Sequence, residues 1–583
     1  MSFKNRITAV ALSCLLTVSL AACGGKDGSS STSSGGNTSA PTAPVIDETM
    51  FSDSDKKTEP SAPTAVTLDG KTLTIGKAGE YVITNSIKSG QLVVDTDKNS
   101  EVHLVLNGVN ITSDAAPAIY IKKAKKVIIT LAEGSENLLS VKGTIADGEE
   151  DGAIYSKCDL TVNGKGSLKA NTESGKGITS KDNLIITGGS FDITSKGHAL
   201  DGNDSIRILD GSFKINTSAD GLHAENLENM DLGFIYMAGG SFDITSGLDG
   251  ISALGSLKIL SGCYKIFSGD GSQVYAAQNN RLSPSDYDAP SFKGIKSGSD
   301  LEISGGEFNI DSEDDALHAN GKVTVSGGSG TISSGDDGIH ADDALTLSGG
   351  KYEIKRSYEG LEGLSITISK GEYSVTSSDD GLNAAGGNDD SGFGGGMRPD
   401  MFGASSDSFI KISGGELRVD ASGDGIDSNG DIIVTGGETY VSGPTNSGNG
   451  AMDFGGNATI SGGIFAAAGA YGMAQNFSST STQGAMLLET KNYTGGTIIK
   501  LTDSAGKTLF SHAFSKMFGS IVISTPDIKV GETYKLYADN EEVASVEMTS
   551  VIYGSGGGMG GPGGMGGQGG HGGPGGMPPG QRW

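Results

Sequence analysis

One pattern repeats about every 22 residues through the stretch Phe292–Ala385, and it limits what this chain can fold into. Each repeat opens with an acidic pair or its equivalent, then has a small, an aliphatic and a polar residue, and ends with two alternating apolar runs around a Gly-Gly turn. Such a period is typical of a β-solenoid, whose coils bury their apolar sides only by stacking on one another. We therefore predict an all-β fold, a parallel β-helix with about 22 residues per coil.

Stacking places each position of the repeat ~4.8 Å from its copy in the next coil, so a sequence column becomes a stripe on the molecule. An aliphatic column should point into the core, and it comprises Ile295, Leu317, Ile339, Leu361 and Leu382. An acidic column precedes it, with Asp314-Asp315, Asp336-Asp337, Tyr358-Glu359 and Asp379-Asp380. A polar column follows it, with Lys296, His318, His340, Glu362 and Asn383.

Carboxylates stacked this closely repel one another unless a cation lies between them. Ca²⁺ fits the gap, because Ca–O distances of ~2.3–2.6 Å let one ion bridge oxygens of two successive coils. Two alternatives remain open: a solvated acidic turn stripe, and a transition metal bound by His318 and His340.

A second column follows the Gly-Gly turns and is mostly aromatic, from Phe191 to Phe465. A stripe in this position is expected to form a stacked core, because apolar residues two positions further on continue the same face. Tyr358 and Tyr440 are expected to point outward, where either ring could stack on a sugar. Cys158 and Cys263 lie several coils apart, so we expect no disulfide between them.

Composition changes along the chain predict its organisation. Residues 1–22 resemble a signal peptide that ends in the lipobox-like Leu20-Ala21-Ala22-Cys23, which predicts lipidation of Cys23 and a membrane-anchored lipoprotein at the cell surface or outer membrane. The other expected segments are a flexible tether (23–64), the β-helix (65–480), a small C-terminal β-module (484–552) and a Gly/Met/Pro tail (553–583).

Three insertions interrupt the coils: Glu225–Phe234, Gln273–Ser291 and Gly386–Ser408, the last a candidate lid carrying Arg398.

The charge balance argues against one class of partner. The 70 Asp and Glu residues outnumber the 42 Lys and Arg residues, which gives a net charge of −28. Nucleic-acid binding needs clustered basic residues, so we expect no nucleic-acid partner. We expect a monomer.

Several long motifs resemble those of the bacterial carbohydrate-binding domain proteins that are built as right-handed parallel β-helices and are distantly similar to family-nine pectate lyases. The motifs are GKAGEYVIT, LVLNGVNITS, AIYSKCDLTVNGKG, GHALDGNDSI, FKGIKSGSDLEISGG, DDGIHAD and SYEGLEG. The resemblance implies a right-handed helix that binds calcium on its acidic coils and binds pectin-like polyuronates and cellulosic glucans. By this similarity the expected calcium ligands are Asp314, Asp315, Asp336, Asp337, Glu359, Asp379 and Asp380.

The resemblance also raises a pectate-lyase reading, in which Ca²⁺ acidifies the proton α to a uronate carboxylate and a basic residue removes it. Lys296, or else Lys293, is the candidate base. The alternatives are a non-catalytic binder, in which these lysines neutralise the acidic column or contact substrate carboxylates, and a surface adhesin or matrix protein. We favour binding without turnover, with the substrate contacted by Lys293, Lys296, His318, His340, Tyr358, Glu362 and Asn383.

Overall fold

The computed structural model describes residues 45–68, 70–145, 150–229, 231–273, 290–385 and 407–554. These residues all belong to one unit, which begins at Pro44. The signal peptide, Cys23, the candidate lid with Arg398, most of the insertion Gln273–Ser291 and nearly all of the tail lie outside the described residues. None of the helices within the described ranges is long and apolar enough to cross a membrane.

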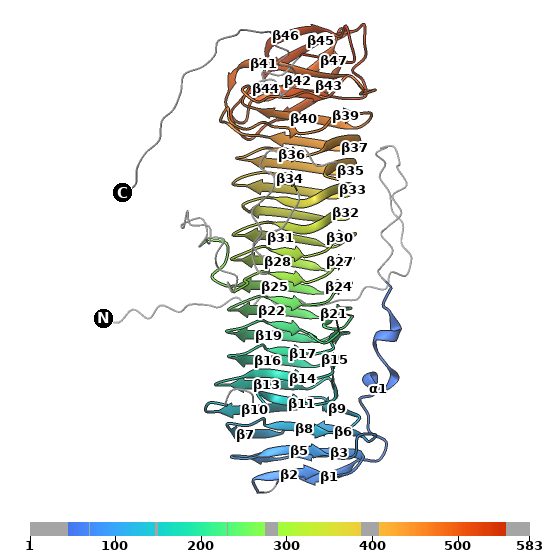
Figure 1. The fold of residues 1–583 in the computed structure, drawn as a ribbon, viewed down its shortest axis with the longest axis vertical. Coiled ribbons are helices and arrows are strands. Elements are labelled where there is room, and N and C mark those ends of the chain that lie inside the picture. The colour runs from blue at the N-terminus through green and yellow to red at the C-terminus, as the bar shows by residue number, and fades with distance from the viewer. Residues whose placement is uncertain are drawn as a thin grey trace, which may run out of the picture. The chain divides into compact units, whose positions relative to one another are not determined.

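The chain winds a 43-stranded sheet into stacked coils, and nearly all neighbouring strands in it are parallel. Figure 1 shows the coils stacked one on another from β1 and β2 to β40. This confirms the predicted parallel β-helix. Each coil contributes to three sheet faces, and the strands pair only with their copies in adjacent coils.

The first face is formed by β2 (Thr72–Ile75), β5 (Gln91–Asp95), β8 (Ile119–Lys123), β11 (Gly152–Ser156), β14 (Lys176–Ser180), β17 (Leu200–Gly202), β20 (Leu222–Ala224), β23 (Ile251–Ala253), β26 (Ile295–Ser297), β29 (Leu317–Ala319), β34 (Leu382–Ala384), β36 (Ile426–Ser428) and β38 (Asp453–Phe454).

The second face is formed by β1 (Thr64–Thr67), β3 (Gly79–Thr84), β6 (Glu101–Leu106), β9 (Lys126–Leu131), β12 (Asp159–Gly164), β15 (Asn183–Ile186), β18 (Ser205–Ile208), β21 (Phe234–Met237), β24 (Leu257–Ile259), β27 (Leu301–Ile303), β30 (Val323–Val325) and β39 (Ala458–Ile460).

The third face is formed by β4 (Ser86–Ile87), β7 (Asn110–Asp114), β10 (Glu136–Lys142), β13 (Ser167–Thr172), β16 (Ser190–Ser195), β19 (Ser212–Thr217), β22 (Ser241–Ser246), β25 (Cys263–Ser268), β28 (Glu307–Ser312), β31 (Ser329–Ser334) and β40 (Ile464–Gly469). Four long strands run around the corners and serve more than one face: β32 (Ile339–Arg356), β33 (Leu361–Ser377), β35 (Phe409–Ala421) and β37 (Asp431–Ser442).

The core is built from the two predicted columns. Every member of the aliphatic column is fully buried. The aromatic column keeps the predicted register from Phe191 to Phe465, and the rings from Phe191 to Phe308 stack with centroids 4.6–5.0 Å apart. The second glycine of each turn before this column takes a positive φ, as at Gly306 (108°), which other residues rarely adopt. As predicted, the described residues contain no disulfide between Cys158 and Cys263.

The C-terminal strands leave the coil pattern. β44 (Phe518–Ser524) pairs antiparallel with β40 and with β41 (Ala485–Tyr493), and β47 (Ile552–Tyr553) lies beside β41. A separate antiparallel sheet holds β42 (Ile498–Asp503), β43 (Thr508–Ala513), β45 (Thr533–Ala538) and β46 (Glu541–Glu547). β44 thereby covers the last strand edge of the coil stack, which would otherwise offer unpaired backbone groups.

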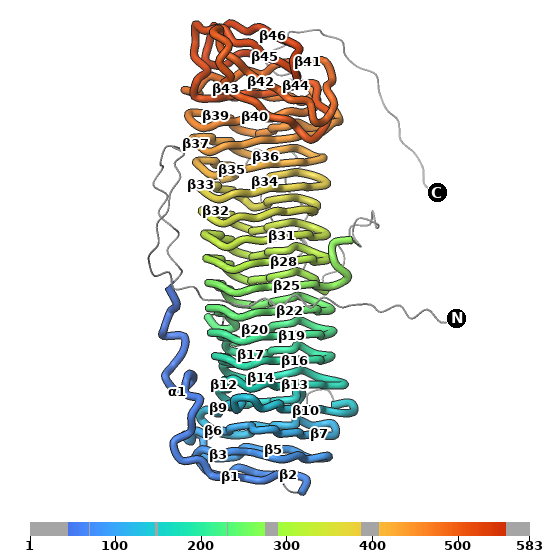
Figure 2. Tube along the Cα trace, turned by 180° about the vertical axis from the view of Figure 1, so that it is seen from behind, coloured from blue at the N-terminus to red at the C-terminus, as the bar shows by residue number. Residues whose placement is uncertain are grey.

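Residues 45–57 differ from the flexible tether expected for residues 23–64. They form a strap along the second face, with the 3-10 helix η1 (Glu48–Met50) and the short helix α1 (Asp53–Lys56). Figure 2 shows α1 beside the early coils. Phe51 is buried and contacts Tyr236, with ring centroids 6.1 Å apart.

Asp55 anchors the strap. Its carboxylate is buried, lies 2.6 Å from Lys126 Nζ and accepts a hydrogen bond from Thr161 Oγ1. Its backbone carbonyl accepts a hydrogen bond from Asn163. The tether expectation rested on polar composition, but a few apolar side chains and one ion pair are enough to hold the segment on the coils.

Candidate functional site

Two polar columns run along the corner where each coil passes from the third face to the first. We call the one that lies two residues before the aliphatic column the corner column; it comprises His198, Asp220, Asp249, Lys293, Asp315, Asp337, Glu359, Asp380 and Asp424. We call the one that directly follows the aliphatic column the strand column; it comprises Asp201, His223, Ser252, Lys296, His318, His340, Glu362, Asn383, Asp427 and Asp453.

The aspartates of the corner column have a structural role that the sequence analysis did not foresee. One oxygen of each accepts the backbone N–H of the next coil, as from Asp337 N to Asp315 Oδ1 (2.9 Å) and from Asp424 N to Asp380 Oδ1 (2.6 Å). The same bond joins Asp249 N to Asp220 Oδ1 (2.9 Å). Each carboxylate therefore fastens two coils together and offers its second oxygen to other partners.

In the middle coils a buried lysine takes that second oxygen. Lys293 is fully buried, and its Nζ lies 2.6 Å from Asp315 Oδ2 and 3.1 Å from Asp314 Oδ2. The lysine charge holds the pKa of Asp315 well below its ordinary value against the opposing effect of burial. Lys293 thus acts as a counter-ion inside the protein, and its burial does not favour a role as a base or as a contact to a polymer.

The two histidines of the next coils are also enclosed by oxygen partners. His318 lies 2.9 Å from Asp315 Oδ2 through Nδ1 and 2.8 Å from Asn320 Oδ1 through Nε2. His340 contacts Glu362 (2.6 Å) through Nδ1 and Asp342 (3.0 Å) through Nε2.

The two rings differ in charge. Burial and Lys293 lower the pKa of His318 to about 4. The surrounding carboxylates, above all Glu362, raise the pKa of His340 well above its ordinary value despite burial. Both rings are buried and both nitrogens of each have partners, which does not favour the transition-metal alternative here.

In the coils after Glu359, unlike those around Lys293, the carboxylates are not balanced by positive charge from the described residues. Asp380, Asp424 and Asp427, which we call the acidic cluster, bring one carboxylate oxygen each to within 4.8 Å of one another. Among the described residues no basic side chain pairs with any of them. Burial, reinforced by the neighbouring carboxylates, raises the pKa of Asp380 to about 9, of Asp427 to about 7 and of Asp424 to about 6.

Asn383 supplies a second feature of this cluster. Its side chain is only 7% exposed, and its Nδ2 donates to Glu359 Oε2 (2.7 Å) on the preceding coil. The register partner of Asn383 on the next coil is Asp427, a member of the acidic cluster. Asn383 Oδ1 accepts no hydrogen bond from the described residues. A buried acceptor left in this way costs free energy unless a donor or cation meets it.

The donor set of the acidic cluster fits Ca²⁺. The ion prefers several carboxylate and amide oxygens, and the cluster offers three carboxylates beside the Asn383 amide oxygen. The expected ligands Asp314, Asp315 and Asp336 also converge within 4.8 Å, but there the Lys293 ammonium already supplies a positive charge. The two places therefore differ in whether a described basic side chain lies beside the carboxylates.

The remaining expected residues lie along the same corner. Asp337 and Glu359 are buried, and Asp379, Tyr358 and Glu362 are partly buried. Lys296 is partly exposed and lies 3.2 Å from Ser291 Oγ and 3.9 Å from Asp249 Oδ2. Four coils separate Lys296 from Asn383, which corresponds to ~19 Å at the spacing of neighbouring strands.

The sequence analysis missed Asp424, Asp427 and Asp453. This coil carries one aspartate, Asp424, where earlier coils carry an acidic pair, and the insertion after Ala385 interrupts the count. The signal was present, because Asp424-Gly425-Ile426-Asp427 repeats the residue order of Asp380-Gly381-Leu382-Asn383 on the preceding coil.

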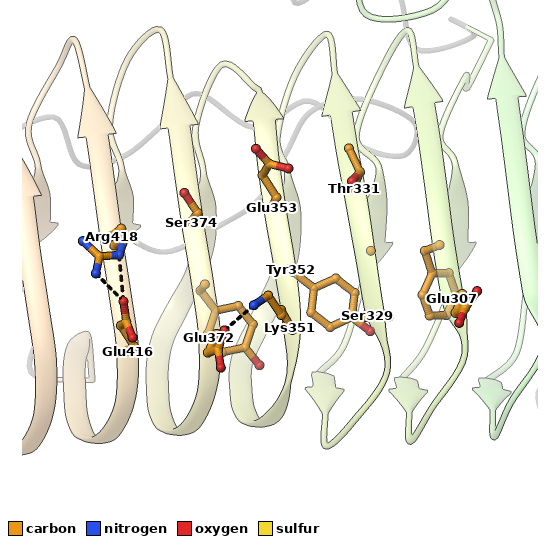
Figure 3. Close-up of a pocket in the computed structure, with 13 residues that line it drawn as sticks. Glu307, Ser329, Thr331, Lys351, Tyr352, Glu353, Glu372, Ser374, Glu416 and Arg418 are labelled. Carbon is orange, nitrogen blue, oxygen red and sulfur yellow. Dashed lines mark hydrogen bonds and ion pairs between the residues drawn. The ribbon is translucent and has the colours of Figure 1, made fainter. Parts of the chain in front are cut away.

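A groove of about 620 Å³ lies on the third face, across β28, β31, β32, β33 and β35 (Figure 3). It forms where Gly330 replaces the aromatic residue of its column, so that Phe308 and Tyr352 are tilted by 32° with centroids 6.2 Å apart. The ion pairs Lys351–Glu372 and Arg418–Glu416 lie along it. These side chains offer the donors and acceptors that sugar hydroxyls require.

Comparisons with known proteins identify the family of this chain. A family model described as "Carbohydrate-binding domain-containing protein" matches residues 69–338 and 336–505. A protein of the same description from Acetivibrio thermocellus is 34% identical over 274 residues, which are 46% of this chain and 92% of that protein.

A solved structure also matches, described as the polysaccharide lyase-like protein from C. thermocellum in a gadolinium derivative. The match has 31% sequence identity and a TM-score of 0.34, and it covers 35% of this chain and 90% of that one. The family model alone spans most of the described coils. The chain belongs to the family of carbohydrate-binding domain-containing proteins.

Proposed function

We propose that this protein binds acidic polysaccharides in a calcium-dependent manner, with Ca²⁺ held by the acidic cluster and Asn383. The observation that carries the proposal is the convergence of Asp380, Asp424 and Asp427 beside a buried amide oxygen, with no base from the described residues to balance them. The expected ligands Glu359 and Asp379 lie next to this cluster and belong to the proposal.

A polyuronate suits such a site because its carboxylates can complete the coordination shell of a bound calcium ion. The chain carries a net charge of −28, so a polyanion is repelled unless cations intervene. Lys296, partly exposed ~19 Å away, is placed to meet a further carboxylate of the same chain of sugars. A polymer can span both places and a single sugar cannot.

Neutral glucans would use a different surface. The groove beside Gly330 offers hydroxyl, carboxylate and guanidinium groups without involving the acidic cluster. Binding of a cellulosic glucan there should not depend on calcium. A chelator therefore distinguishes the two ligand classes, because EGTA should weaken the binding of polyuronates and leave the binding of neutral glucans unchanged.

The direct test is retention of the protein on polygalacturonate in calcium and in EGTA, beside a cellulosic glucan. We expect at least a tenfold loss of polygalacturonate affinity in EGTA and in Asp427→Asn, a smaller loss in Lys296→Ala, and little change on the glucan. The matched control is Asp243→Asn, an exposed aspartate of the third face. Equal retention in calcium and EGTA would refute the calcium mechanism and favour an adhesin that uses outward aromatic and polar groups.

The geometry favours binding over lyase chemistry. A pectate lyase needs its base and its calcium at the same uronate. Lys296 is four coils from the acidic cluster, and Lys293 is buried in ion pairs with Asp314 and Asp315. Following the ultraviolet absorbance of unsaturated uronide during the same incubation tests this point, because its appearance would establish the lyase.

The proposal includes attachment to a membrane through a lipid on Cys23, which would display the coils at the cell surface. Its support is the lipobox-like Leu20-Ala21-Ala22-Cys23 after a basic and apolar segment. Metabolic labelling with a radioactive fatty acid should mark the wild type and not Cys23→Ala. Label on both proteins, or on neither, would remove the anchor from the proposal.

A further inference from the structure

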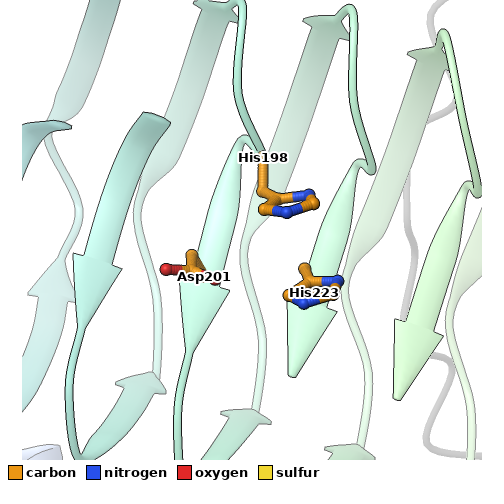
Figure 4. Close-up of side chains that lie close together, drawn as sticks. All are labelled: His198, Asp201 and His223. Atoms are coloured by element: carbon orange, nitrogen blue, oxygen red, sulfur yellow. The ribbon is translucent and has the colours of Figure 1, made fainter. Parts of the chain in front are cut away.

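A second polar cluster lies in earlier coils, at the N-terminal end of the same two columns. It comprises His198, Asp201 and His223, which come from the neighbourhood of β17 and β20 (Figure 4). One atom from each, a nitrogen of either ring and a carboxylate oxygen, lies within 4.8 Å of the other two. The two rings are stacked, with centroids 3.9 Å apart and planes inclined by 7°.

Asp220 orients both rings. Its Oδ2 lies 2.7 Å from His223 Nδ1 and 3.2 Å from His198 Nδ1, while its Oδ1 accepts the backbone N–H of Asp249. The carboxylate is therefore fixed by the next coil, and the Asp220 backbone N–H donates to His198 Nδ1 (3.2 Å). A histidine whose Nδ1 has a fixed partner presents Nε2 in a defined direction, as metal-binding histidines do.

The outer side of the cluster supplies oxygen donors. Glu225 Oε2 lies 3.7 Å from His223 Nε2, on the insertion that follows β20. Asp201 is paired with Lys176 at 2.8 Å through Oδ2, which leaves Oδ1 for another partner. The rings and Glu225 are partly exposed, unlike the enclosed pair His318 and His340, so an ion has access.

We propose that His198, His223, Asp201 and Glu225 form a site for a late first-row divalent cation such as Zn²⁺. Two imidazole nitrogens with carboxylate oxygens are the donors that Zn²⁺ takes at ~2.0–2.2 Å, whereas Ca²⁺ prefers oxygen alone. The site thus differs from the acidic cluster in its nitrogen donors. An ion held between successive coils would also join these coils to each other.

Binding changes the geometry of the site. The two ring planes are inclined by only 7°, so their nitrogen lone pairs lie in nearly parallel planes, and the rings must turn before both can point at one ion.

The test is a calorimetric titration of the full chain, without a histidine tag, with Zn²⁺ in excess Ca²⁺ that saturates the oxygen sites. We expect one ion per chain in this class of site and a raised melting temperature. His198→Gln and His223→Gln should each weaken binding at least tenfold. The matched control His318→Gln, which alters the enclosed ring pair, should leave it unchanged.

Glu225→Gln, which alters a partly exposed side chain on a connecting loop, keeps the test decisive if a histidine variant fails to fold. It should weaken binding several-fold, and the imidazole NMR signals of the wild type should shift on adding Zn²⁺. Zn²⁺ binding that persists in His198→Gln, His223→Gln and Glu225→Gln would overturn the proposal. Loss of binding only in the control His318→Gln would overturn it too. Absence of binding to the wild type would leave the two rings as counter-ions of Asp220 and would equally overturn it.

Discussion

Lys293 and the acidic cluster show how a single residue decides what a coil can bind. Lys293, Asp380 and Asp424 occur in the corner column, where carboxylates are stacked at the spacing of neighbouring strands, and Asp427 lies in the adjoining strand column. Lys293 neutralises Asp314 and Asp315 from within. Asp380 and Asp424 have no described base beside them, so their charge is available to an external cation.

Replacing Lys293 should convert the first arrangement into the second. Lys293→Met keeps most of the side-chain volume but leaves Asp315 buried without its counter-ion, which costs about 3–5 kcal/mol of unfolding free energy. Because Asp314, Asp315 and Asp336 converge, added Ca²⁺ should recover part of this loss. Denaturant unfolding in EGTA and in calcium measures both effects.

The control for this experiment is Lys351→Met, which removes an exposed ion pair with Glu372 and should change stability little. If Lys293→Met were as stable as the wild type in EGTA, or gained nothing from calcium, the counter-ion role of Lys293 would be refuted.

The strap shows how a short element is held by the coils. It buries Phe51 against Tyr236, and Asp55 reaches Lys126, Thr161 and Asn163 on the second face. Residues from coils far apart in sequence thus bind one segment. Local stability should depend on these few contacts, because the strap adds no strand to the sheet.

Phe51→Ala with Asp55→Asn should release the strap without unfolding the coils. We expect faster amide exchange at residues 45–57 and at the neighbouring part of β12, with unchanged exchange in β28 and β31. Hydrogen–deuterium exchange with mass spectrometry measures all of these regions at once. Unchanged exchange at residues 45–57 would show that the strap is held by contacts other than these two.

The repeat made the coils predictable because stacking forces every copy of a position into one register. The aromatic column from Phe191 to Phe465 and the burial of Ile339 and its copies followed directly from the period. The strap was not predictable in this way, since its contacts join residues that share no period. Neutralisation of the acidic column by Lys293 was one of several alternatives, and the sequence could not choose among them because a column fixes the position of a residue and not the partner of its side chain.

Along the whole stack, the balance of positive and negative side chains in the corner and strand columns changes. From His198 to Glu362 the corner and strand columns mix lysine and histidine with carboxylates, and from Asp380 to Asp453 they contain only acids and one asparagine. In the first part burial raises the pKa of Asp249 and Asp337, but Lys293 lowers the pKa of Asp315 and two histidines lower that of Asp220. In the second part the pKa values of Asp380, Asp424, Asp427 and Asp453 are all raised. We infer that the C-terminal coils are the part of the molecule that calcium stabilises.

The raised pKa values of the acidic cluster determine whether the stability of the folded state rises or falls with pH. The folded-state pKa values of about 6, 7 and 9 in the acidic cluster exceed the ordinary value of 3.8, so the metal-free folded state binds more protons than the unfolded state. The acidic cluster therefore contributes to the free energy of unfolding below pH 3.8, and this contribution is lost as the pH rises through about 6 to 9. A calcium ion bound to the acidic cluster would replace these protons, so the stabilisation by calcium should grow over the same pH range.

The most direct measurement is therefore the melting temperature in EGTA and in excess calcium, at pH 5 and pH 8, for the wild type, Asp427→Asn and the exposed control Asp243→Asn. Calcium at ~100 times its Kd adds roughly 2.7 kcal/mol. We predict a clear calcium-induced rise at pH 8, a much smaller one at pH 5, loss of the rise in Asp427→Asn, and wild-type behaviour in the control. Asp427→Asn should also be more stable than the wild type in EGTA at pH 8. A wild type that melts identically with and without calcium at pH 8, once its removal by EGTA is verified, would contradict the account.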